Sequence, residues 1–166
     1  MSATELVADL ATRARTAART LSTATGAERK AALEAIAQAL ESRSAEILAA
    51  NEADMVNARA ENMHPQMQDR LLLTAERIKA IAAGAREVAA LPDPLGQILR
   101  KSTLPNGLEL EQISVPFGVI GMVYEARPNV TVDAAVILLM SGNAALLRGS
   151  STARNSNEIL VNVMKE

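Results

Sequence analysis

The pattern of apolar and polar residues predicts helices in the first part of the chain. Within residues 1–92, small and aliphatic side chains recur every three or four positions, as on the buried face of an amphipathic helix. The repeats cover residues 6–21, 33–40, 47–56 and 78–89. Segment 1–92 is therefore predicted to be a succession of alanine-rich helices.

A different pattern follows in residues 96–115, where two extended arms flank Pro105-Asn106-Gly107. An Asn-Gly pair between two apolar runs is a strong local signal for a β-hairpin. Because a two-stranded hairpin is marginally stable in water, we expect this one to pack on another surface. Either a neighbouring subunit or the rest of the same chain would provide that surface.

The last part of the chain, residues 116–166, has the pattern of a β-α-β-α unit. Residues 119–124 are an apolar run typical of a strand buried on both faces, and residues 144–147 form a second such run. A helix is predicted between them at 130–140, and residues 148–151 are predicted to open a last helix. Two parallel strands joined by a helix follow from this order.

Polar side chains gather where the two predicted strands end. Ligands of parallel sheets bind beyond the carboxyl ends of the strands. We therefore expect Arg127 and Arg148 to meet an anionic ligand in a shared cleft there, because a guanidinium matches phosphate or carboxylate with paired hydrogen bonds. The residues at these ends are Glu125, Arg127, Pro128, Asn129, Arg148, Gly149, Ser150 and Ser151.

Composition excludes several classes of function. A formal charge of -2 and 1% aromatic residues disfavour a nucleic-acid partner. The chain has no cysteine, and its one histidine, His64, precedes a proline in a polar stretch, so no metal site is expected. The apolar run 130–140 contains Asp133 and is shorter than the about 20 residues of a membrane span. These features predict a cytoplasmic protein of one domain.

The first residues also resemble an organellar transit peptide, because Arg13, Arg15 and Arg19 lie among small residues. Glu5 and Asp9 oppose that interpretation. The helical spacing of the apolar residues favours a structural first helix, with a removable leader as the alternative.

The run V-P-F-G-V-I-G-M-V-Y-E-A-R-P-N-V-T-V-D at residues 115–133 is a specific signature. It resembles the gamma-glutamyl phosphate reductase family, also called glutamate-5-semialdehyde dehydrogenase, of the aldehyde dehydrogenase superfamily. Asp69-Arg70-Leu71 and Pro92-Asp93-Pro94 resemble the same family in the same order. The implied fold is α/β and aldehyde-dehydrogenase-like: the N-terminal part of a Rossmann-type cofactor-binding domain, with preceding helices and a β-hairpin.

The resemblance implies reduction of L-glutamyl 5-phosphate by NADPH to glutamate 5-semialdehyde and phosphate, a step of proline biosynthesis. Family members use a cysteine thiolate as nucleophile and are much longer than this chain of 166 residues without cysteine. We therefore expect an incomplete NADP-binding domain, without the catalytic domain and inactive alone. The resemblance also implies a homo-oligomer and association with glutamate 5-kinase.

Roles for single residues follow from the same resemblance. Arg148 stands where the superfamily has a lysine near the adenosine ribose, so with Ser150 and Ser151 at a helix start it is expected to hold the 2'-phosphate of NADP. Asn129 is expected to donate to the oxyanion. Glu125, Arg127, Pro128 and Gly149 are also expected to line the cofactor site, and Asn129 is expected to bind the substrate together with Arg127.

Other interpretations of these residues stay open. Arg127 is expected either to bind the phosphate or carboxylate of the substrate, or to form a structural pair with Glu125. For Arg148 the alternative is an ion pair with a surface carboxylate. Asp133 is expected to make a polar contact at the start of the predicted helix. For the whole chain, a helical interaction module or a nucleotide-binding regulatory domain without redox chemistry are the alternatives to an enzyme.

Overall fold

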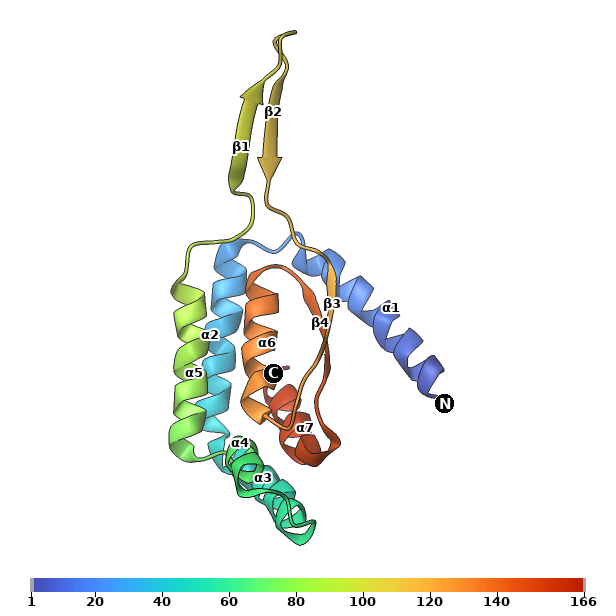
Figure 1. Ribbon diagram of the computed structural model, residues 1–166. Coiled ribbons are helices and arrows are strands. Elements are labelled where there is room, and N and C mark those ends of the chain that lie inside the picture. The colour runs from blue at the N-terminus through green and yellow to red at the C-terminus, as the bar shows by residue number, and fades with distance from the viewer. Residues whose placement is uncertain (1, 166) are drawn as a thin grey trace.

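The computed structural model describes residues 2–165 as a helical body with a small parallel sheet on one side and a protruding hairpin (Figure 1). No helix in this range is both long and apolar enough to cross a membrane. The elements in chain order are α1 (Ala3–Leu21), α2 (Gly26–Ser42), α3 (Ser44–Ala60), α4 (Pro65–Leu71), α5 (Ala75–Ala90), β1 (Ile98–Thr103), β2 (Glu109–Ile113), β3 (Val119–Val123), α6 (Pro128–Met140), β4 (Ala144–Arg148), the 3₁₀ turn η1 (Ser151–Ala153) and α7 (Arg154–Val163).

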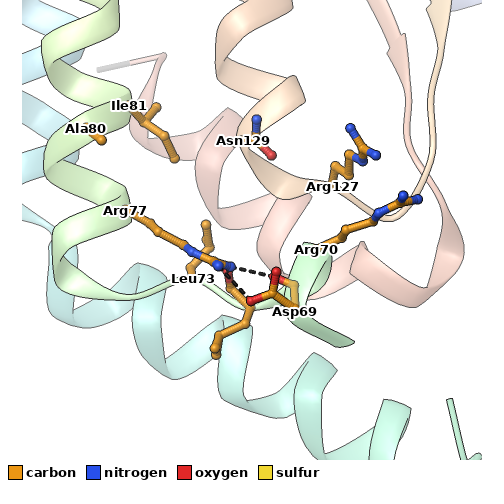
Figure 2. A pocket seen from close by; sticks show the side chains of 9 residues that line it. Asp69, Arg70, Leu73, Arg77, Ala80, Ile81, Arg127 and Asn129 are labelled. Atoms are coloured by element: carbon orange, nitrogen blue, oxygen red, sulfur yellow. Dashed lines mark hydrogen bonds and ion pairs between the residues drawn. The ribbon is translucent and has the colours of Figure 1, made fainter. Parts of the chain in front are cut away.

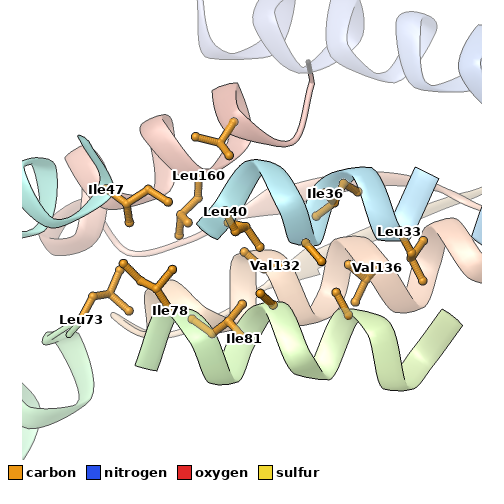
Figure 3. Packing of buried hydrophobic residues seen from close by; sticks show 14 of the residues in the cluster. Leu33, Ile36, Leu40, Ile47, Leu73, Ile78, Ile81, Val132, Val136 and Leu160 are labelled. Carbon is orange, nitrogen blue, oxygen red and sulfur yellow. The ribbon is translucent and has the colours of Figure 1, made fainter. Parts of the chain in front are cut away.

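The main core lies between α2, α5 and α6, with α3 and α7 closing one end (Figure 3). Fully buried alanines on α2 and α5, such as Ala37 and Ala82, let these two helices pack closely. The predicted periodicity is thus confirmed. The largest fully buried apolar side chains of this core are Leu33, Leu40, Ile47, Ile78, Val132, Leu160 and Val163.

The sheet confirms the predicted β-α-β connection. β3 and β4 run parallel, with Val119 opposite Ala144 and Val123 opposite Arg148, and α6 joins them. The prediction that both strands are buried on both faces is wrong, because Val123 of β3 is 76% exposed and only Ala144 of β4 is buried. The first helix packs through Ala14 and Ala18 on the start of the sheet and leaves the end of β3 uncovered.

The hairpin stands away from the helical body (Figure 1). Its two antiparallel strands pack mainly on each other, and every residue of β2 is exposed. Within residues 2–165, the alternative that the hairpin packs on the rest of its own chain is therefore wrong. Its exposed apolar side chains are Ile98, Leu99, Leu104, Leu108, Leu110, Ile113 and Val115.

A buried arginine holds the base of the hairpin against α2. Arg29, 3% exposed, donates from one terminal nitrogen to both oxygens of the Asp93 carboxylate at 2.7 Å, and also donates to the carbonyl of Ala24. A hydrogen bond from the backbone N–H of Leu95, together with the charge of Arg29, lowers the pKa of Asp93. Residue 26 must be glycine here, because a Cβ would collide with the Asp93 carboxylate.

A buried polar network ties α3 to α7 and to the loop before α5. The Asp54 carboxylate, 1% exposed, accepts the backbone N–H of Asn155 at 3.1 Å and that of Ser156 at 2.8 Å. It also accepts from both of their side chains. Beside it, the Asn51 amide donates to the Leu71 carbonyl and to Ser156, and accepts from the Leu73 N–H at 2.7 Å. Every polar atom of this network thus has a partner.

We predict that Asp54→Ala lowers the free energy of unfolding by about 3 kcal/mol, because four donors lose their acceptor in a buried place. Asp54→Asn, which keeps the volume, should also destabilise because its NH₂ group faces N–H donors. Urea denaturation measures both effects. Glu52→Ala, two residues earlier on the exposed face of α3, is the control and should change stability by less than about 0.5 kcal/mol. If Asp54→Asn were as stable as the unaltered protein, the two carboxylate oxygens of Asp54 would not be needed as hydrogen-bond acceptors, which would contradict this prediction.

We also predict an acid-sensitive contribution from Asp93. Asp93→Ala leaves the Arg29 guanidinium buried without its anion and should cost about 3 kcal/mol near neutral pH. Because the folded pKa lies below the ordinary 3.8, this contribution is complete above pH 3.8 and is lost as the pH falls through the lowered pKa. Urea denaturation of both proteins between pH 7 and pH 3 should show the gap closing. A gap that stays constant in acid would overturn the assignment.

Candidate functional site

The turn after β3 places the predicted residues at the start of α6. Arg127 is extended (φ -132°), as expected for a residue before proline, and Pro128 is the first residue of the helix. Tyr124 fixes this turn, since its N–H donates to the Arg148 carbonyl at 3.1 Å and its hydroxyl lies 2.8 Å from the Thr131 hydroxyl. The start of α6 is therefore tied to the end of β4.

An open cavity of about 420 Å³ lies beside this turn (Figure 2). Its walls come from the end of α4, the loop before α5, α5 itself and the first residues of α6. It is lined by Asp69, Arg70, Leu72, Leu73, Arg77, Ala80, Ile81, Arg127 and Asn129. The structure thus brings Arg127 and Asn129 together, and adds two arginines that the sequence interpretation missed.

The three arginines of the cavity differ in their partners. Arg77 is held in place, because it bonds the Asp69 carboxylate at 2.7 Å and the Leu72 carbonyl at 2.8 Å. Arg70 and Arg127 instead approach one oxygen of the exposed Glu125 carboxylate, at 3.4 Å and 3.3 Å. The predicted alternative of an Arg127–Glu125 pair is therefore observed. Within residues 2–165, the other guanidinium N–H groups of Arg70 and Arg127 have no hydrogen-bond partner.

Asn129 is oriented by a carboxylate one turn along α6. Its Nδ2 donates to Oδ2 of Asp133 at 3.0 Å, which engages one amide hydrogen and leaves the other and Oδ1 available. Burial raises the pKa of Asp133, and the bond from Asn129 partly opposes that shift. The predicted polar contact of Asp133 at the helix start is thus with Asn129.

Arg148 does not line the cavity that contains Arg127. It is exposed at the end of β4, where the only hydrogen bond of its guanidinium group among residues 2–165 is a 3.4 Å bond to the Gly149 carbonyl. The expected cleft shared by Arg127 and Arg148 is therefore wrong for this cavity. The alternative pairing of Arg148 with a surface carboxylate is absent within the same residues.

The helix start predicted at Ser150 and Ser151 lies further along the chain. These residues form the short η1 turn, and α7 begins at Arg154. The N–H groups of Asn155 and Ser156, at the positive end of α7, are already bound by Asp54. These two N–H groups are therefore not available to a phosphate, and the role of Ser150 and Ser151 in holding the 2'-phosphate of NADP stays a prediction.

Gly149 has a packing requirement of its own. A Cβ at this position would collide with the side-chain amide of Asn157, so the turn after β4 needs glycine. A second open cavity of about 420 Å³ adjoins it, between the strand ends and α7. That cavity is lined by Tyr124, Leu147, Gly149, Asn157, Glu158, Val161, Asn162 and Lys165.

Comparison with known proteins gives a consistent result, although no family model matches the chain. The chain is 55% identical over 156 residues to the gamma-glutamyl phosphate reductase of Geobacillus thermodenitrificans, which covers 94% of this chain and 38% of that protein. It is 52% identical over 161 residues to the Kineococcus radiotolerans protein of the same name, covering 97% and 37%. The chain therefore spans less than two fifths of the length of these relatives.

Solved structures agree with these relatives. The gamma-glutamyl phosphate reductase of Thermotoga maritima matches with a TM-score of 0.90 and 39% identity, over 93% of this chain and 37% of that one. The Saccharomyces cerevisiae structure of the same name matches with a TM-score of 0.89 and 29% identity, over 99% and 41%. In sequence and in fold, this chain is therefore similar to the N-terminal part of proteins named gamma-glutamyl phosphate reductase.

Proposed function

We propose that this chain is part of an enzyme that reduces L-glutamyl 5-phosphate with NADPH, in proline biosynthesis. The observation that carries the proposal is the 55% identity over 156 residues to a protein named gamma-glutamyl phosphate reductase. In this reaction a hydride from NADPH replaces the phosphate on the acyl carbon, and the released phosphate takes up a proton. The products are glutamate 5-semialdehyde, phosphate and NADP⁺. The substrate class is thus an acyl phosphate with an additional carboxylate.

The cavity beside the β3–α6 turn suits such a substrate. Arg70 and Arg127 offer guanidinium donors to its anionic groups, and both lie on the cavity lining. Asn129, held by Asp133, keeps an amide hydrogen that can donate to the oxygen on which negative charge develops. We therefore assign substrate binding to Arg127 and oxyanion stabilisation to Asn129.

The turn after β4 suits the phosphate of NADP. The Arg148 guanidinium is exposed with a single weak contact, so it has donors free for a 2'-phosphate. Ser150 and Ser151 follow it on the η1 turn and offer hydroxyl groups, while Glu125, Pro128 and Gly149 are proposed to border the cofactor. NADPH, when bound, supplies the hydride. The contribution of this chain is to bind and orient it.

The sequence has no cysteine. The thiolate that the family resemblance implies would therefore come from residues beyond these 166.

We further propose that the hairpin binds a second copy of the protein. Its exposed strands offer backbone hydrogen-bonding groups and a row of apolar side chains, which favour association. Association with glutamate 5-kinase and a cytoplasmic location stay predictions.

The function is tested with the complete protein in the reverse direction. Glutamate 5-semialdehyde, phosphate and NADP⁺ should together give NADPH, followed by its absorbance at about 340 nm, and omission of phosphate should abolish the signal. Phosphate-independent reduction of NADP⁺ would contradict the proposal.

For the cofactor site, we predict that Arg148→Ala in the complete protein raises KM for NADP⁺ about tenfold, because a charge-assisted bond to the 2'-phosphate is lost. KM for phosphate should stay unchanged. Arg154→Ala serves as the control, since this exposed arginine forms an ion pair with Glu158 and with no other residue between 2 and 165. An unchanged KM for NADP⁺ would remove Arg148 from the cofactor site.

For the hairpin, we predict that Ile98→Glu with Ile113→Glu, a pair of opposite residues on β1 and β2, weakens self-association. Light scattering after size exclusion should then show a smaller species. The control is Lys101→Glu with Glu111→Lys, which exchanges the charges of a 3.0 Å ion pair on the same strands. An oligomer that survives the apolar-to-charged pair would place the interface elsewhere.

A further inference from the structure

We propose that Arg70 and Arg127 form one binding site for an anionic group of the substrate, and that Glu125 occupies this site as an internal competitor. The inference rests on the proposed function, and it adds Arg70 as a binding residue and a competing role for Glu125. The chemistry recognised is an oxyanion, either the phosphate or the carboxylate of the substrate.

The geometry shows two guanidinium groups that approach the same carboxylate oxygen, Arg70 with a hydrogen bond and Arg127 as an ion pair without one. Arg70 reaches Oε2 of Glu125 at 3.4 Å from α4, and Arg127 reaches the same oxygen at 3.3 Å from the start of α6. Figure 2 shows both side chains extending toward the same side of the cavity. Within residues 2–165 neither has another polar partner, so most of their donors are unused.

The charges are unbalanced at this point. Two positive groups face one carboxylate, and the third arginine of the cavity, Arg77, is neutralised by Asp69. A phosphate group carries more charge and more acceptor oxygens than Glu125, and its oxygens can bridge two guanidinium groups. The pair is therefore better matched to an external oxyanion than to its internal partner.

The backbone beside each of the two arginines is fixed by buried residues, whereas the ion pairs of their guanidinium groups with Glu125 are weak. Leu71, next to Arg70, is fully buried and its carbonyl accepts from Asn51, and Pro128, next to Arg127, is buried as well. Glu125 is 69% exposed and lies on the turn between β3 and α6. Exposed ion pairs of this kind are weak, so an incoming anion can displace Glu125 without moving β3 or α6.

The test uses the complete protein in the reverse reaction with phosphate, glutamate 5-semialdehyde and NADP⁺. Arg70→Gln should raise KM for the anionic substrate about tenfold, because it removes charge-assisted hydrogen bonds. Glu125→Gln should lower the same KM about threefold, because it removes the competing charge of an exposed ion pair. General damage to the site would raise KM in both variants. Only competition by Glu125 predicts that KM falls in Glu125→Gln while it rises in Arg70→Gln.

The matched control is the surface pair of Arg59 and Glu52 on α3, at 2.9 Å with similar exposure. Arg59→Gln and Glu52→Gln should leave all KM values unchanged. A shift in KM for phosphate assigns the site to the phosphate group, and a shift in KM for the semialdehyde assigns it to the carboxylate.

Two results would overturn the inference while the unaltered protein remains active. One is an Arg70→Gln variant with unchanged KM values for phosphate and semialdehyde. The other is a Glu125→Gln variant whose KM values rise or stay constant. An unaltered protein without phosphate-dependent activity would instead refute the proposed function, so the two failures are distinguishable.

Discussion

The buried carboxylate of Asp54 is the constraint on which the arrangement of this chain depends. A carboxylate at 1% exposure is tolerated only when its acceptor sites are filled, and here the start of α7 fills them. The adjacent Asn51 bonds both Leu71 and Leu73, so the same network fixes the loop at the edge of the cavity. Because Leu71 is the last residue of α4, the hydrogen bond from Asn51 to its carbonyl also fixes the neighbouring Arg70. The position of Arg70 in the cavity therefore depends on a buried network behind the cavity wall.

Sequence patterns predicted the elements well where the information is local. The helical periodicity of residues 1–92, the turn at Pro105-Asn106-Gly107 and the strand-to-helix turn at Pro128 each depend on neighbours along the chain. The predicted burial of β3 failed because burial depends on what covers a strand, and α1 covers only its beginning. The predicted helix start at Ser150 is observed as the 3₁₀ turn η1, which leads directly into α7. The binding of the first N–H groups of α7 by Asp54 was not predictable, because Asp54 is distant in sequence.

The same distinction between local and long-range information applies to the residues that line the cavity beside the β3–α6 turn. Arg127 and Asn129 were identifiable because both lie within a few residues of the end of β3. Arg70 lies on α4, and only the packing of α4 against α3 brings it to the cavity. The resemblance of Asp69-Arg70-Leu71 to the family was the one signal that could have identified it. Arg148 ends β4, whereas Arg127 follows the end of β3 in the turn before α6, and it lines the cavity beside α4 while Arg148 does not.

The contrast between rigid and loosely held groups fits a reaction in which phosphate is both bound and released. The backbones beside Arg70 and Arg127 are fixed by buried residues, which limits the entropy lost when a substrate binds. Their charged ends are held only by an exposed carboxylate, Glu125. Two unopposed arginines would also bind the product phosphate tightly and slow its release. A carboxylate that returns to the site as phosphate leaves lowers that affinity, so an internal competitor favours turnover at the expense of ground-state binding.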